Sequence, residues 1–138
     1  MTQHEPAHVG TIAWTDLTVE RADIVRDFYR EVVGWTVSDV DMGGYLDYCM
    51  NRPDDGRAAA GICWKRGTNA DLPAQWLVYI TVASIQDSSA RCTELGGRII
   101  AGPKHTPGYG TFCVIQDPWG AVAALFEPES LRLCATLR

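Results

Sequence analysis

Asp16 is the residue whose type and setting most favour acid–base chemistry. It follows Trp14 by two positions within the apolar segment VGTIAWTDLTV of residues 9–19. Because residues two apart in a strand share a face, we expect Trp14 and Asp16 to lie side by side. An acid among apolar groups is desolvated, which suits a general base. The alternative is that Asp16 caps the following turn or bonds a neighbouring backbone N–H.

A second candidate group lies in the loop of residues 102–110, which contains three glycines and two prolines. Lys104, His105 and Tyr109 are able to close over a ligand there, or to supply an acid and a base near neutral pH. An ordinary solvated hairpin loop explains them equally well. The other histidines, His4 and His8, precede the first predicted strand and are expected to be exposed.

The five cysteines are an odd number and form no C-x-x-C pair. Most lie in apolar segments, where a free cysteine behaves as a small hydrophobic residue. We therefore expect reduced, structural thiols, as in a cytoplasmic protein. They are Cys49, Cys63, Cys92, Cys113 and Cys134.

Composition restricts the class of protein. The 138 residues are 46% hydrophobic, which suits one packed domain, and the net charge of −5 gives no basic surface for nucleic acid. The sequence shows neither a secretory leader nor the roughly 18 consecutive apolar residues that a membrane span needs. A cytoplasmic protein that acts on neither nucleic acid nor membrane is expected.

The elements that must position Asp16 follow a regular order. The strand of residues 9–19 precedes an amphipathic helix that ends at Gly34, and three strands at 35–40, 45–50 and 58–64 come next. After a linker at 65–74, the order repeats. It comprises a strand at 76–82, a helix at 85–95, an extended piece at 98–101, and strands at 111–116 and 121–127 joined by the type I turn DPWG.

An offset of 63 residues superposes the two halves of the chain. It places Val19 on Val82 and Gly34 on Gly97, so that strand end and helix end coincide. We predict one domain at residues 9–128, with modules at about 9–66 and 75–128. Residues 1–8 are expected to be a flexible N-terminus and residues 129–138 a C-terminal tail.

These motifs together resemble the vicinal-oxygen-chelate superfamily, which includes glyoxalase I, bleomycin-resistance-type binding proteins and extradiol dioxygenases. The resemblance spans about residues 9–128 and rests on four motifs: WTDL at 14–17, DFYREVVGW at 27–35, LGG at 95–97 and DPWG at 117–120. It implies an α+β fold in which two paired βαβββ modules form an open half-barrel around a cavity. It also implies a homodimer.

The metal-dependent members of that family place ligands on the first and last strands of each module. Alignment of the motifs puts Trp14, Leu77 and Ala124 on three of these positions, and the fourth falls near Tyr48 or Cys49. Trp14, Leu77 and Ala124 offer no donor for a divalent metal. We therefore expect no metal and no cofactor.

The resemblance combined with strand alternation predicts an apolar and aromatic ligand site with few polar groups. The residues expected to bind a ligand are Trp14, Asp16, Tyr48, Leu77, Tyr79, Ala124, Phe126 and Tyr109. One hypothesis is a binding protein that sequesters a small hydrophobic or aromatic molecule. The other is a metal-independent isomerase, cyclase or lyase with Asp16 as base and His105 or Tyr109 as acid. A purely structural dimerisation module would leave the inward acid unexplained.

Overall fold

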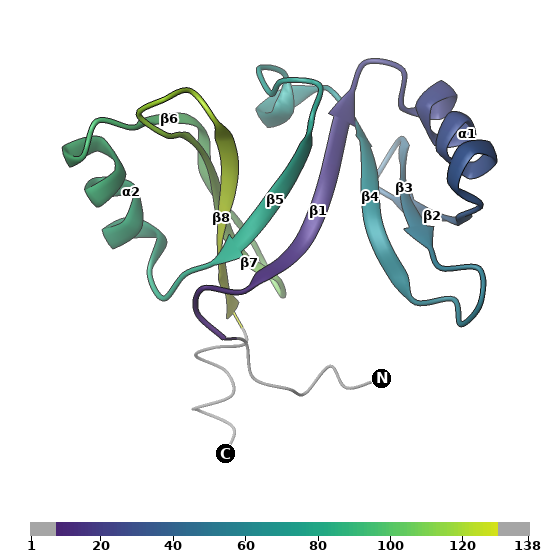
Figure 1. The fold of residues 1–138 in the computed structure, drawn as a ribbon, viewed down its shortest axis with the longest axis horizontal. Coiled ribbons are helices and arrows are strands. Elements are labelled where there is room, and N and C mark those ends of the chain that lie inside the picture. Colours follow the sequence, from purple (N-terminus) through teal and green to yellow (C-terminus); the bar gives the residue numbers. More distant parts are fainter. Residues whose placement is uncertain (1–7, 130–138) are drawn as a thin grey trace. The chain divides into compact units, whose positions relative to one another are not determined.

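The computed structural model describes residues 8–129 (Figure 1). The predictions for the N-terminus up to residue 7, the tail from residue 130, His4 and Cys134 lie outside the described residues. The first elements are β1 (Ile12–Val19), α1 (Ala22–Val33), β2 (Thr36–Asp41), β3 (Leu46–Asn51) and β4 (Ala58–Trp64), followed by a short 3-10 helix, η1 (Gly67–Asn69). The remaining elements are β5 (Trp76–Thr81), α2 (Ile85–Glu94), β6 (Arg98–Thr106), β7 (Gly110–Gln116) and β8 (Val122–Pro128). The order βαβββ occurs twice, which confirms the predicted α+β class.

The described chain forms two compact units, which we call the N-terminal unit (residues 14–77) and the C-terminal unit (residues 8–13 and 78–129). Strands in the N-terminal unit follow the order β2-β3-β4-β1, and those in the C-terminal unit the order β5-β8-β7-β6. In each unit the first and last strands of the βαβββ order pair in parallel, whereas the other neighbours are antiparallel.

The parallel ladders show the internal repeat directly. Asp16 pairs with Gly61 in the N-terminal unit, and Tyr79 pairs with Ala124 in the C-terminal unit. Both members of the first pair are offset by the same 63 residues from the members of the second. The next two rungs obey the same offset, so the two ladders occupy equivalent positions in two copies of one module.

Helix α1 covers one face of the N-terminal sheet (Figure 1). It ends because Gly34 adopts the left-handed conformation (φ 90°), and the Gly34 N–H donates to the carbonyl of Arg30 at 3.0 Å. The core beneath it combines residues from the strands with apolar residues from the helix. Its buried members are Leu17, Ala22, Tyr48, Met50 and Ile62.

Helix α2 covers one face of the C-terminal sheet in the same way. Ser84 caps the helix by accepting a hydrogen bond from the Asp87 N–H at 3.1 Å. Buried Ile85, Cys113 and Leu125 form the core between helix and sheet. The predicted turn after β7 is present, because the Gly120 N–H donates to the Asp117 carbonyl at 3.0 Å.

The prediction that residues 102–110 form a loop is wrong for the first half of that segment. Strand β6 continues to Thr106 through register irregularities between Ile99 and Lys104. Gly102 has φ 80°, and a side chain there would meet the Phe112 carbonyl oxygen at 2.8 Å. A bulge tolerates both this glycine and the following Pro103, which has no N–H for the ladder.

None of the helices within residues 8–129 has the length and apolar character required to cross a membrane.

Candidate functional site

The candidate site is the face of the N-terminal sheet opposite α1. The ladders align Asp16 on β1 and Cys49 on β3 with Gly61 on β4, and they align Thr18 with Cys63. Since paired residues point to the same side of a sheet, these side chains share one face. We call it the strand face and define it as Trp14, Asp16, Thr18, Cys49, Gly61 and Cys63.

Trp14 and Asp16 form the central contact of the strand face. The Trp14 indole Nε1–H donates to the Asp16 carboxylate oxygen Oδ1 at 2.5 Å, and both residues are half-buried. The same oxygen lies directly against Gly61. An aromatic ring therefore lies next to a carboxylate whose direction is fixed by two neighbours.

A second acid, Asp47, lies beside the strand face and is only 8% exposed. It accepts a hydrogen bond from the Trp64 N–H at 3.0 Å, but burial outweighs that bond and raises the pKa of Asp47. Burial also raises the pKa of Cys63, and the carboxylates of Asp16 and Asp47 raise it further. The strand face thus combines thiols of raised pKa with one acid, Asp16, and a second acid, Asp47, lies beside it.

The structure corrects the sequence assignment at Tyr48. Tyr48 is 7% exposed and belongs to the core under α1, where the Arg26 guanidinium lies 4.6 Å from the centre of its ring. Cys49 is the residue that shares the face of Asp16, because it pairs with Gly61. The apolar residues Tyr48 and Met50, which alternate with Asp47, Cys49 and Asn51, were the signal that would have assigned these faces from the sequence.

In the C-terminal unit, the face opposite α2 is apolar. Tyr79 pairs with Ala124, and Ala124 pairs with Val114 on its other side. Ala124 and Val114 have no exposed surface, whereas Tyr79 and Phe126 are half-buried. Leu77, which belongs to the N-terminal unit, is also fully buried. Of these predicted ligand residues, Tyr79 and Phe126 have exposed surface that a ligand could contact, whereas the predicted contacts of Leu77 and Ala124 find no exposed surface.

His105 lies on the α2 side of the C-terminal sheet, away from the Tyr79 side. It pairs with Thr111, which in turn pairs with Glu127. Its Nδ1 is 3.1 Å from the Thr111 hydroxyl, and its Nε2 is 3.8 Å from the Glu129 carboxylate. Tyr109 is 72% exposed. Within this unit, His105 is thus separated from Tyr79, Ala124 and Phe126 by the thickness of the sheet.

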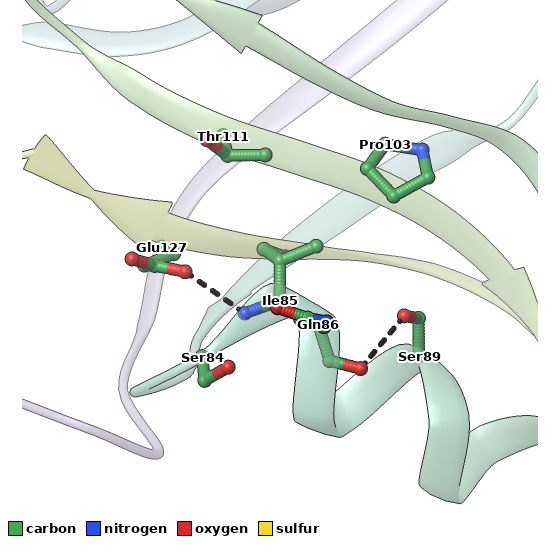
Figure 2. Close-up of a pocket in the computed structure, with 7 residues that line it drawn as sticks. All are labelled: Ser84, Ile85, Gln86, Ser89, Pro103, Thr111 and Glu127. Carbon is green, nitrogen blue, oxygen red and sulfur yellow. Dashed lines mark hydrogen bonds between the residues drawn. The ribbon is translucent and has the colours of Figure 1, made fainter.

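A pocket of about 470 Å³ lies on this α2 side (Figure 2). Its lining consists of Ser84, Ile85, Gln86, Ser89, Pro103, Thr111 and Glu127. Figure 2 shows the Glu127 carboxylate accepting from the Ile85 N–H at 2.9 Å and the Ser89 hydroxyl donating to the Gln86 carbonyl at 3.1 Å. The Ser84 cap and the Glu127 carboxylate satisfy two free N–H groups in the first turn of α2, those of Asp87 and Ile85, so these two polar groups of the lining already have a structural role.

The donor set does not fit a divalent metal. The family resemblance places metal ligands on the first and last strands of each module, and three of these positions carry Trp14, Leu77 and Ala124. The fourth falls on β4 at Gly61, which the 63-residue repeat superposes on Ala124, and not near Tyr48 or Cys49 on β3 as predicted. None of these four residues has a side-chain donor for a divalent metal. Within residues 8–129, no three His, Cys, Asp or Glu side chains come together as a metal site.

Comparison with known proteins gives a consistent family. The family model described as Glyoxalase/Bleomycin resistance protein/Dioxygenase superfamily matches residues 11–125. The chain is 31% identical over 119 residues to the protein named "Putative glyoxylase CFP32" of Mycobacterium tuberculosis (strain CDC 1551 / Oshkosh), and 27% identical over 118 residues to the anthracycline biosynthesis protein DauV of Streptomyces sp. (strain C5). These alignments cover 86% of this chain but only 44% and 42% of the relatives.

Solved structures agree on the fold. The methylmalonyl-CoA epimerase of Mycobacterium tuberculosis has a TM-score of 0.55 with this chain at 15% identity, over 98% of this chain and 99% of the epimerase. At that identity, the likeness shows the fold alone.

The buried thiols predict a loss of stability at alkaline pH. Burial, with a smaller contribution from Cys92, raises the pKa of Cys113 to about 11. A cysteine in the unfolded chain ionises near pH 8.5. The contribution of the buried, protonated Cys113 thiol to the free energy of unfolding is therefore fully present below that pH and is lost as the pH rises through 11. We expect the free energy of unfolding in urea under reducing conditions to fall by roughly 2 kcal/mol more in wild type than in Cys113→Ala between pH 8.5 and 11. If the free energy of unfolding falls equally with pH in the two proteins, the burial of this thiol would be contradicted.

Proposed function

The chain belongs to the Glyoxalase/Bleomycin resistance protein/Dioxygenase superfamily, and we propose that it binds a small aromatic molecule at the strand face without the help of a metal ion. The observation that carries the proposal is the contact between the Trp14 indole and the Asp16 carboxylate. The ligand class follows from these two groups: a flat ring to lie against Trp14, with a hydroxyl or amine to donate to Asp16.

The two groups supply different parts of the affinity. An aromatic pair contributes about 0.5–1.5 kcal/mol beyond the burial of its area. A hydrogen bond to a charged group adds about 1.5–3 kcal/mol, provided that the ligand donor loses no better partner in water. A carboxylate has about four acceptor sites, so the bond from the Trp14 indole does not by itself prevent Asp16 from accepting a hydrogen bond from a ligand.

The names of two relatives support an aromatic ligand. DauV and DnrV are named anthracycline biosynthesis proteins, and anthracyclines are planar aromatic compounds with hydroxyl groups. The chain spans less than half the length of these relatives, so their activities enter here as support for a ligand class only. The predicted ligand contacts of Tyr79 and Phe126, within the C-terminal unit, stay a prediction of their own, and so does a cytoplasmic location.

A second candidate function is a metal-independent isomerase, cyclase or lyase with Asp16 as general base. It is favoured by the presence of two acids in unlike environments around Cys63. Burial holds Asp47 towards its neutral form, whereas Asp16 is half-buried and accepts from the Trp14 indole. Pairs of this kind divide the roles of acid and base in many enzymes. The position of His105 on the α2 side of its sheet lends no support to its role as the acid.

Substitution of Trp14 and Asp16 separates binding from turnover. We use 1,4-dihydroxyanthraquinone as a planar phenolic probe and measure its affinity by calorimetry. For a binding protein, Trp14→Ala removes the buried area of the ring as well as the aromatic pair and should weaken binding roughly 2–10-fold or more. The factor should be larger than for Asp16→Asn, because asparagine keeps a hydrogen-bond acceptor. For an enzyme, Asp16→Asn should lower turnover of a candidate substrate about 10²–10⁴-fold with little change in affinity, as mass spectrometry of the product would report.

Two variants serve as controls for these substitutions. Trp119→Ala removes a tryptophan that is 97% exposed in the turn after β7, and Asp39→Asn neutralises an exposed acid on β2. Both should leave the affinity for the probe unchanged. If all four variants bind like wild type, the ligand does not contact the strand face.

Removal of metal provides an independent test. Because Trp14, Leu77 and Ala124 offer no ligand atoms, EDTA should leave the melting temperature and the affinity for the probe unchanged. Elemental analysis of the purified protein should find no stoichiometric transition metal. One zinc, nickel or iron per chain would contradict the assignment of the ligand positions.

A homodimer is a further part of the proposal, because exposed sheet edges favour pairing with a second copy. Sedimentation equilibrium at tens of micromolar should give the mass of two chains. A single-chain mass at that concentration would contradict it.

A further inference from the structure

Gly61 lies in the middle of β4 and is buried, yet its backbone does not require a glycine. Its φ is not positive, and it pairs with β1 on one side and with β3 on the other. Glycine in the interior of a strand weakens the strand, because it has no side chain to pack and loses more conformational freedom. The residue must therefore be explained by the space around it.

The space above Gly61 is filled by the two central residues of the strand face. A Cβ at this position would overlap Oδ1 of Asp16, and it would lie 3.4 Å from Asp16 Cγ and 3.6 Å from Cζ2 of Trp14. The carboxylate oxygen Oδ1 thus occupies the space that a side chain at position 61 would need. The Trp14 contact is an ordinary one, so the conflict is with the Asp16 carboxylate.

The internal repeat shows that the fold itself accepts a side chain here. Ala124 occupies the equivalent position on β8, opposite Tyr79, and it carries its methyl group with no exposed surface. Alanine also occupies the three preceding positions of β4. The glycine at position 61 is therefore tied to the presence of Asp16 opposite it, and not to the strand or to the module.

The carboxylate has little freedom to avoid a methyl group at position 61. Asp16 and Gly61 are paired in a parallel ladder that continues through Leu17–Ile62 and Thr18–Cys63, so β1 is unable to retreat locally. The side chain of Asp16 would have to rotate off the sheet. Such a rotation would break the hydrogen bond from the Trp14 indole to Oδ1.

We propose that Gly61 is the positioning residue of the ligand site: its missing side chain lets Asp16 lie against β4 in contact with the Trp14 indole. This inference rests on the proposed function and adds which residue sets the ligand specificity of the site. With the carboxylate held close to the β4 backbone beside the indole, the site selects planar aromatic ligands whose hydroxyl or amine projects from the ring edge. A carboxylate rotated off the sheet would occupy the space of the ring itself.

The test is a cycle of four proteins: wild type, Gly61→Ala, Asp16→Ala and the double variant. The first readout is the Trp14 indole N–H resonance in ¹H–¹⁵N spectra, assigned with Trp14→Phe. Gly61→Ala should move this resonance as Asp16→Ala does, because both remove the bond to Oδ1. The indole resonances of Trp64, bonded to the Leu46 carbonyl, and of Trp76, bonded to the Tyr29 hydroxyl, should stay in place.

The second readout is the urea midpoint of unfolding. Gly61→Ala should lower the midpoint when Asp16 is present, and it should leave it unchanged or raise it in the Asp16→Ala background. If Gly61→Ala alone does not fold, the double variant carries the test, because removal of the carboxylate should restore folding. Equal destabilisation in both backgrounds, no restored folding, or an unmoved Trp14 resonance would each overturn the positioning role.

The affinity for 1,4-dihydroxyanthraquinone distinguishes this inference from the proposed function. Gly61→Ala should weaken binding at least as much as Asp16→Ala. The affinity of the double variant should be no lower than that of the single variant with the lower affinity. Failure of wild type to bind any planar phenol overturns the proposed function, and with it the role of Gly61 in specificity. Wild-type binding that Gly61→Ala leaves intact overturns the inference alone.

Discussion

The parallel pairing of the first and last strands of a module is the constraint on which the rest of the structure depends. In the N-terminal unit it sets Asp16 opposite Gly61, and in the C-terminal unit it sets Tyr79 opposite Ala124. Parallel neighbours need a long connection, which the helix and the two intervening strands provide. Because each helix covers one face of its sheet, the residues that alternate with the core are left to form a site on the other.

Two copies of one module carry different chemistry at equivalent positions. The strand face of the N-terminal unit has a carboxylate, an indole and two thiols, whereas the corresponding face of the C-terminal unit is largely apolar. Within the described residues, the positions where the family resemblance implies metal ligands offer no donor, and the strand face that we propose as the site has the groups to bind an aromatic molecule with a hydrogen-bond donor. Function is decided by these few side chains, and the fold only sets where they lie.

Much of this architecture could be predicted from the sequence, because its signals are local. The helix stop at Gly34, the DPWG turn and the 63-residue repeat depend on residues close together in the chain. The face of Tyr48 and the course of β6 could not be predicted, because strand register and bulges depend on pairing partners far away in sequence. Gly61 had no signal of its own, since its role exists only when Asp16 lies opposite.

The most direct test of the account is a crystal structure of the protein with 1,4-dihydroxyanthraquinone bound. We expect the ring of the quinone to lie against the Trp14 indole, with a phenolic hydroxyl within hydrogen-bond distance of the Asp16 carboxylate. A quinone seated instead in the pocket at the first turn of α2, or one that leaves Trp14 and Asp16 untouched, would contradict the claim that the strand face is the binding site.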